Sequence, residues 1–77
     1  MEKLINQLQQ AYPHEIKEIK VAGPAEINIY LNDGAVAEKF SQELQDHLVS
    51  TIDELTIIKI NVYDSAGTLR DSFASNQ

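Results

Sequence analysis

The spacing of apolar residues predicts an amphipathic helix at residues 2–12. The apolar positions there recur at the three- and four-residue intervals that bring side chains to one side of a helix. They are Leu4, Ile5, Leu8, Ala11 and Tyr12. Pro13 ends this helix, because the residue before a proline is pushed out of the helical conformation.

Two short runs of alternating apolar and polar residues follow, and each predicts a β-strand. In residues 16–22, Ile19 and Val21 face one way, and in residues 25–31 the alternation is strict. The inward positions of the second run are Ala25, Ile27, Ile29 and Leu31, and the outward ones are Glu26, Asn28 and Tyr30. Gly23-Pro24 is a turn signal between the runs, which predicts an antiparallel hairpin.

The segment Asn32-Asp33-Gly34 is compatible with a hairpin turn or with the start of a helix. The residues after it have a helical period, which favours Asn32 or Asp33 as an N-cap that accepts hydrogen bonds from the first turn. Glu38 near that end suits the helix dipole. The predicted helix ends near Val49, and its apolar side holds Val36, Ala37, Phe40, Leu44, His47 and Leu48.

The most apolar run, residues 55–63, predicts a third strand. Its core side holds Ile58, Ile60 and Val62, and its other side holds Ile57, Lys59, Asn61 and Tyr63. Residues 64–67 have the composition of a type I turn. A returning strand at 68–73 then places Leu69 and Phe73 on one face, and we expect residues 73–77 to fray.

This order, α-β-β-α-β-β, predicts an α+β fold in one domain, residues 1–77. We expect a two-layer sandwich with both helices on one face of a three- or four-stranded sheet. The other sheet face would be open to water or to a partner. The chain has no cysteine, so no disulfide can stabilise it, and a domain this small gains from association.

The charge balance argues against nucleic acid as a partner. Twelve acidic and six basic residues give a net charge of −6, whereas phosphate binding depends on lysine and arginine. The Gly-x-x-Gly loop of K-homology domains and the aromatic motifs of ribonucleoprotein domains are absent. The apolar runs are too short to span a bilayer and the first residues do not resemble a secretory signal. We therefore expect a soluble, cytoplasmic protein with no membrane partner.

No motif predicts catalysis, a metal or a cofactor. His14 follows Pro13 in a polar loop, and His47 has Glu43 one helical turn before it. No serine lies in a Gly-x-Ser-x-Gly turn, and the three glycines are isolated. We expect no enzyme activity. The alternative is a small enzyme or ligand-binding domain that uses His14, His47 and nearby carboxylates.

The open sheet face is the strongest candidate for a functional surface. Its predicted contact residues are Glu26, Asn28, Tyr30, Ile57, Lys59 and Tyr63. Tyrosine is enriched at interfaces because it buries area and keeps a polar group, although it is also a common strand former. The sequence therefore predicts a protein-interaction or assembly module, with a homodimer as the simplest assembly, and a wet sheet face as the alternative.

Overall fold

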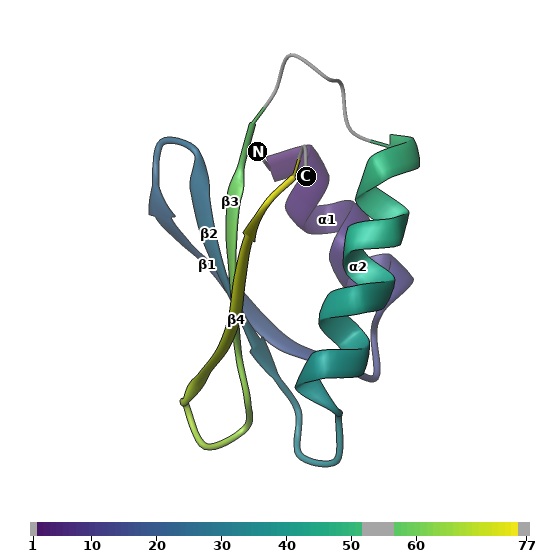
Figure 1. Ribbon diagram of the computed structural model, residues 1–77, viewed down its shortest axis with the longest axis vertical. Coiled ribbons are helices and arrows are strands. Elements are labelled where there is room, and N and C mark those ends of the chain that lie inside the picture. Colours follow the sequence, from purple (N-terminus) through teal and green to yellow (C-terminus); the bar gives the residue numbers. More distant parts are fainter. Residues whose placement is uncertain (1, 52–56, 76–77) are drawn as a thin grey trace.

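A computed structural model describes residues 2–51 and 57–75, with residues 49–51 described by their backbone alone. Its helices and strands follow one another along the chain in a helix-strand-strand-helix-strand-strand order (Figure 1). They are α1 (Glu2–Ala11), β1 (Ile16–Gly23), β2 (Glu26–Leu31), α2 (Ala37–Thr51), β3 (Lys59–Tyr63) and β4 (Leu69–Ala74). The predicted α+β class is confirmed.

The strands form one mixed sheet in the order β1-β2-β3-β4. The pairs β1–β2 and β3–β4 are antiparallel, as expected for strands joined by short turns, whereas β2 and β3 are parallel. Parallel neighbours need a crossover connection, and α2 lies in that connection. The two central strands are therefore β2 and β3, and β1 and β4 are the edges.

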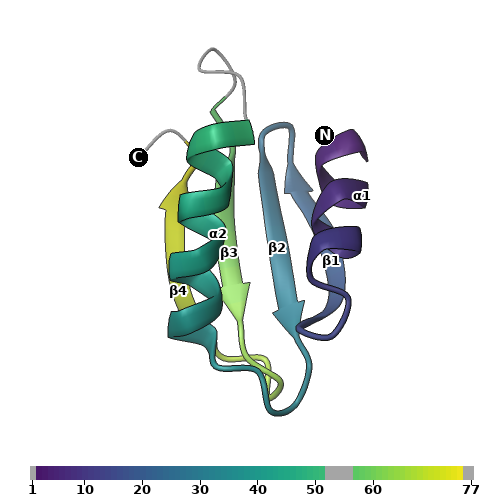
Figure 2. The ribbon, with the colours of Figure 1, turned by 90° about the vertical axis from the view of Figure 1, so that its right-hand side faces the viewer.

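Both helices lie on the same side of the sheet (Figures 1 and 2). Helix α1 packs against β1, and α2 packs against β3 and β4. The core between these layers is formed by the buried apolar residues Leu4, Leu8, Ile16, Ile27, Ile29, Leu31, Ala37, Phe40, Leu44, Leu48, Ile58, Ile60, Val62 and Phe73. Within residues 2–51 and 57–75, no helix is long and apolar enough to cross a membrane.

The central strands have the predicted core residues. Every second residue of β2 from Ile27 to Leu31 is buried, and so are Ile60 and Val62 of β3. The inward position expected for Ala25 is wrong, because Ala25 lies exposed in the turn between β1 and β2. A turn residue is not subject to the alternation of the strand that follows it.

Helix α2 begins later than its expected N-cap. The backbone N–H of Ala35 donates to the carbonyl oxygen of Asn32 at 3.2 Å, which closes a tight turn instead of a helix. Gly34 adopts a positive φ of 93° in this turn, a conformation that favours glycine. The Asn32 side chain donates from Nδ2 to the carbonyl oxygen of His14 at 3.2 Å. Asn32 and Asp33 are therefore not the cap, and the helix starts at Ala37.

A bulge in β4 changes which face Leu69 occupies. Val62 pairs with Asp71 but Tyr63 pairs with Leu69, so Arg70 is an extra residue in the edge strand. The prediction that Leu69 and Phe73 share a face is therefore wrong. Leu69 lies on the side away from the helices, and Phe73 is in the core.

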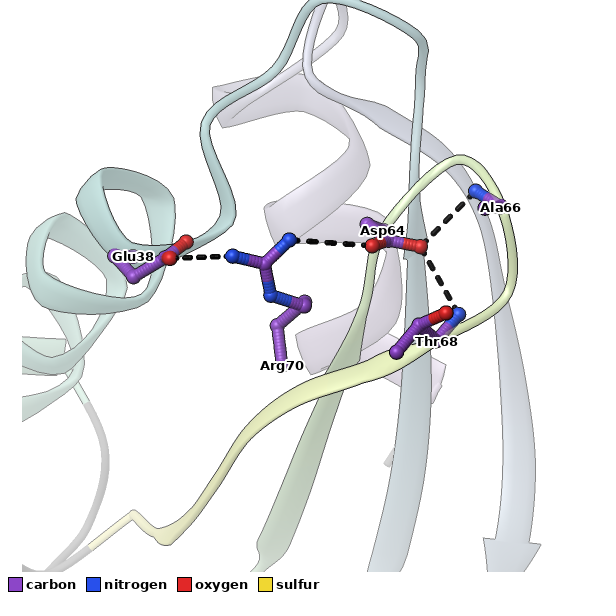
Figure 3. A network of polar contacts seen from close by, with 5 residues as sticks. All are labelled: Glu38, Asp64, Ala66, Thr68 and Arg70. Carbon is purple, nitrogen blue, oxygen red and sulfur yellow. Dashed lines mark hydrogen bonds and ion pairs between the residues drawn. The ribbon is translucent and has the colours of Figure 1, made fainter.

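Arg70 connects the bulge to the start of α2 (Figure 3). Its Nη2 donates to Oε1 of Glu38 at 2.6 Å, and its Nη1 donates to Oδ2 of Asp64 at 3.3 Å. Asp64 in turn accepts backbone hydrogen bonds from Ala66 and Thr68 through Oδ1. These ion pairs join the bulged residue of β4 to the start of α2 and to the turn after β3.

The last described residues of the chain contact the rest of the sheet. Phe73 and Ser75 are both buried. The backbone N–H of Ser75 donates to the carbonyl oxygen of Ile58 at 2.9 Å, and its hydroxyl accepts from the Ile58 N–H at 3.0 Å. Residues 73–75 thus pack against the rest of the sheet, while fraying of the tail stays a prediction and 76 and 77 lie outside the described residues. The same holds for 55 and 56, the expected start of the third strand.

Candidate functional site

The sheet side opposite the helices is the candidate site, and we call it the outer face. None of the described elements crosses it (Figures 1 and 2). Strand register and alternation place twelve residues there in three rows. From β1 to β4, the rows are Glu18, Tyr30, Tyr63 and Leu69; Lys20, Asn28, Asn61 and Ser72; and Gly23, Glu26, Lys59 and Ala74.

The first row contains an aromatic pair. The rings of Tyr30 and Tyr63 stack with centroids 4.8 Å apart and planes 16° apart. Leu69 lies next to Tyr63 in the register and is 52% exposed. On the other side, Lys20 Nζ is 5.5 Å from the centroid of Tyr30, a cation–π distance, and 3.9 Å from a carboxylate oxygen of Glu18. Tyr30, Tyr63 and Leu69 therefore form an apolar patch, and the charged residues Glu18 and Lys20 of β1 lie at one end of it.

The middle row is a hydrogen-bond network centred on Asn61. Its Nδ2 donates to Oε2 of Glu26 at 2.7 Å and to Oδ1 of Asn28 at 2.8 Å. Its Oδ1 accepts from the hydroxyl of Ser72 at 2.7 Å. Asn61 is only 6% exposed, although it lies on the open side of the sheet. The network links β2, β3 and β4 and makes the centre of the outer face rigid, because each partner fixes the orientation of the amide.

The third row carries one charge of each sign on the two central strands. Glu26 of β2 and Lys59 of β3 are neighbours in the strand register. Lys59 is exposed and makes no ion pair within the described part of the chain, whereas Glu26 is partly buried and is held by Asn61. Gly23 and Ala74 flank this pair, so its neighbours on the edge strands have little or no side chain.

Both edge strands are poorly suited to pairing with another strand. Strand β1 has register irregularities at Lys17 and Ala22, and β4 has the bulge at Arg70. Asp71 also points from β4 toward the helix layer, where Oγ of Ser41 donates a hydrogen bond to it. Bulges and inward-pointing charges are devices that discourage edge-to-edge association. The outer face is therefore a better candidate for association than either edge.

Five of the six predicted contact residues lie on the outer face as expected, and Ile57 lies two residues before the start of β3, 55% exposed. Their role as an interface stays a prediction. Sequence reasoning missed the contribution of Leu69, because alternation without a bulge places it in the core. It also missed Asn61 as the centre of a network. The alternation had placed Asn61 on this face, but its partners depend on the strand order.

The two histidines lie in different surroundings. His14 is in the loop after α1, and the ring of His47 on α2 is 6.0 Å from that of Tyr12 in an edge-on arrangement. In the part of the chain that the structure describes, no three His, Asp or Glu side chains are grouped to hold a metal ion. The alternative function based on His14 and His47 stays a prediction.

A hollow of about 250 Å³ lies between the loop after α1 and the start of α2. Its lining residues are Glu15, Gly34, Ala35, Val36, Lys39, Phe40 and Glu43. The Tyr12 ring packs edge-on against Phe40 at 5.2 Å. Burial, followed by the charges of Glu43 and Glu15, raises the pKa of the Tyr12 hydroxyl above its usual value of 10.0. The lining mixes charges of both signs and does not favour one class of ligand.

Comparisons of the chain with protein-family models, with curated proteins and with solved structures find no significant match. Any proposal for its function therefore rests on the described residues alone.

Proposed function

We propose that this protein is an interaction module that forms homodimers through the outer face of its sheet. The observation that carries the proposal is the stacked pair of Tyr30 and Tyr63, which lies beside the exposed Leu69 on a face that no described element covers. Burial of water-accessible aromatic and aliphatic groups by a partner lowers the free energy and so stabilises the complex. Tyrosine in particular is enriched among the residues that contribute most to binding.

The charges of the outer face favour a second copy over a strongly charged partner. The face carries Glu18 and Glu26 against Lys20 and Lys59, so it is neutral although the whole chain has a net charge of −6. A neutral face with charges of both signs can meet itself without net repulsion. The negative charge on the rest of the surface limits how many copies can gather, which favours a closed dimer over larger aggregates.

The size of the face sets the expected affinity. Four strands about 4.8 Å apart, with five residues at about 3.3 Å each, cover roughly 19 by 17 Å. This projection of roughly 320 Å² is smaller than the roughly 800 Å² per partner of a standard interface, even though side chains add accessible area. We therefore expect a reversible dimer with a dissociation constant in the micromolar range.

A dilution series followed by NMR tests the proposal. As the dimer forms, backbone resonances of outer-face residues such as Tyr30, Asn61 and Tyr63 should shift with concentration. Resonances of α1, for example that of Leu8, should stay constant because this helix lies on the opposite side of the sheet. A chain that remains monomeric up to about 1 mM, equivalent to an association free energy weaker than about 4 kcal/mol, would overturn the proposal.

A further inference from the structure

The two central strands present matching rows of side chains. Because β2 and β3 are parallel and in register, Glu26 lies level with Lys59, Asn28 with Asn61 and Tyr30 with Tyr63. Each row therefore has one residue on β2 and one on β3, on either side of the line that separates these two strands. This arrangement decides how a second copy of the face can be placed on the first.

A two-fold axis between two flat faces lies in the plane of the interface, because only then does the rotation carry one face onto the other. An axis that runs along the strands, between β2 and β3, exchanges the two strands and keeps every row at its level. Glu26 then lies opposite the partner's Lys59, and Tyr30 lies opposite the partner's Tyr63. Each dimer contains both contacts twice.

An axis that runs across the strands gives worse contacts. It places each strand opposite the same strand of the partner. The third row then lies opposite either the partner's third row or another of the partner's rows. If it meets itself, Glu26 faces the partner's Glu26 and Lys59 faces the partner's Lys59, which is repulsive. If the axis passes through the middle row, the carboxylate of Glu26 faces the partner's Tyr30 and loses water without gaining a cation.

The surroundings of Glu26 and Lys59 favour contacts with the partner. Lys59 has no ion pair among residues 2–51 and 57–75, so its charge is available. Asn61 holds Oε2 of Glu26 at 2.7 Å, which orients the carboxylate on the outer face. Gly23 and Ala74 beside this pair leave room for a partner to approach.

We propose that the dimer has its two-fold axis along the strands, between β2 and β3, with Glu26 of each copy paired with the partner's Lys59. This inference rests on the proposed function, since it specifies the geometry of the same dimer. The inference concerns contacts between the two central strands of each copy, because the twist of each sheet separates the edge strands of facing sheets.

The double variant Glu26→Lys with Lys59→Glu tests the axis. It exchanges the two charges within one chain, so the net charge is preserved, while each copy loses the hydrogen bond from Asn61 to Glu26. Under the proposed axis, the swapped protein forms its own dimer, with each pair reversed. A mixed dimer of wild type and swapped protein would place Glu26 opposite a glutamate and Lys59 opposite a lysine.

The experiment is native mass spectrometry of an equimolar mixture of isotope-labelled wild type and unlabelled swapped protein, each shown to be folded by a urea melt. We expect two kinds of homodimer and at least about tenfold less mixed dimer than random pairing gives. Mixed dimers at or above the random share would contradict the axis, since contacts of Glu26 with Glu26 and of Lys59 with Lys59 favour mixing. A folded swapped protein that no longer dimerises would also contradict it.

A second measurement uses the wild type alone, so it does not depend on the folding of a variant. Isotope-filtered NOE spectra of a mixed-label dimer should contain contacts between Glu26 and the partner's Lys59. Contacts between Tyr30 and the partner's Glu26 would instead indicate an axis across the strands and overturn the inference. A wild type that stays monomeric in both experiments overturns the dimer itself, which distinguishes failure of the proposed function from failure of the axis alone.

Discussion

Tyr30 and Tyr63 stack on neighbouring parallel strands with their ring centroids 4.8 Å apart, although helix α2 separates them in the sequence. Parallel in-register strands place equivalent positions side by side, so two tyrosines that follow the same alternation come into contact. The pair has Leu69 next to it on β4 and Lys20 over one ring. It is the main apolar feature of the outer face and the basis for the proposed dimer.

The network around Asn61 predicts a large effect for a very small substitution. In Asn61→Asp, an oxygen replaces the Nδ2 group that donates to Glu26 and Asn28, so acceptors face acceptors and two carboxylates lie close together. We expect a loss of about 2 kcal/mol or more in the free energy of unfolding at neutral pH. Urea melts measure it. Asn28→Asp is the matched control, because Asn28 uses its oxygen, which remains. An Asn61→Asp protein as stable as Asn28→Asp would contradict the role of the network.

The Asp64 turn predicts a dependence of stability on acid. The backbone N–H of Thr68, then Arg70 and the N–H of Ala66, lower the pKa of Asp64 below its usual value of 3.8. A carboxyl whose pKa is lowered by folding stabilises the fold above its unfolded pKa, and this stabilisation is lost as the pH falls through the folded pKa.

We therefore expect Asp64→Asn to be less stable than wild type at neutral pH, and the difference to shrink once the pH falls below about 3.8. Urea midpoints of both proteins across the acid range measure this. Asp33→Asn removes one carboxylate from an exposed turn and serves as the control. A difference between wild type and Asp64→Asn that stays constant with pH would show that the carboxylate charge is not the cause.

The Tyr12 hydroxyl should titrate above the usual pH for a tyrosine. Burial raises the pKa of its hydroxyl above 10.0, and the carboxylates of Glu43 and Glu15 raise it further because they disfavour a second negative charge. In an ultraviolet titration, Tyr12→Phe should remove a component whose pKa lies above 10.0. Glu43→Gln should lower that pKa, whereas Glu18→Gln, which removes a charge from the outer face, should leave it in place. Equal effects of the two glutamine variants would contradict the assignment.

The alternation of apolar residues was sufficient to predict the central strands and their core residues. In β2 and β3, every second residue from Ile27 and from Ile60 is buried, because a strand with one covered face has a period of two. The same period placed Tyr30 and Tyr63 on the outer face, together with Lys59. It could not predict that the two tyrosines touch, since that depends on the parallel pairing of β2 with β3.

Local interruptions account for what the sequence could not predict. The bulge at Arg70 moves Leu69 to the outer face, and Arg70 there pairs with Glu38, which is distant in the sequence. The turn at Asn32 delays α2 because that asparagine bonds to the loop at His14 instead of capping the helix. Ser75 is held by Ile58, the residue just before β3, which composition at the end of a chain does not reveal. In each case the deciding partner is remote in the sequence.

The role of the tyrosine pair predicts a selective loss of association. Tyr63→Ser removes one ring of the stacked pair from each copy, and buried tyrosines in the centre of interfaces commonly contribute about 2 kcal/mol or more. Its effect on the fold itself should stay within about 1 kcal/mol, because the ring lies outside the core. Val36→Ser is the matched control, since Val36 is 60% exposed in the loop before α2, away from the outer face.

Sedimentation equilibrium of wild type, Tyr63→Ser and Val36→Ser, with urea melts to confirm that all three are folded, tests the proposed dimer most directly. We expect wild type and Val36→Ser to dimerise with equal affinity. We expect Tyr63→Ser to dimerise more weakly by at least about 30-fold for each ring lost, and its dimer loses two rings. A Tyr63→Ser protein that associates as tightly as wild type would contradict an interface on the outer face.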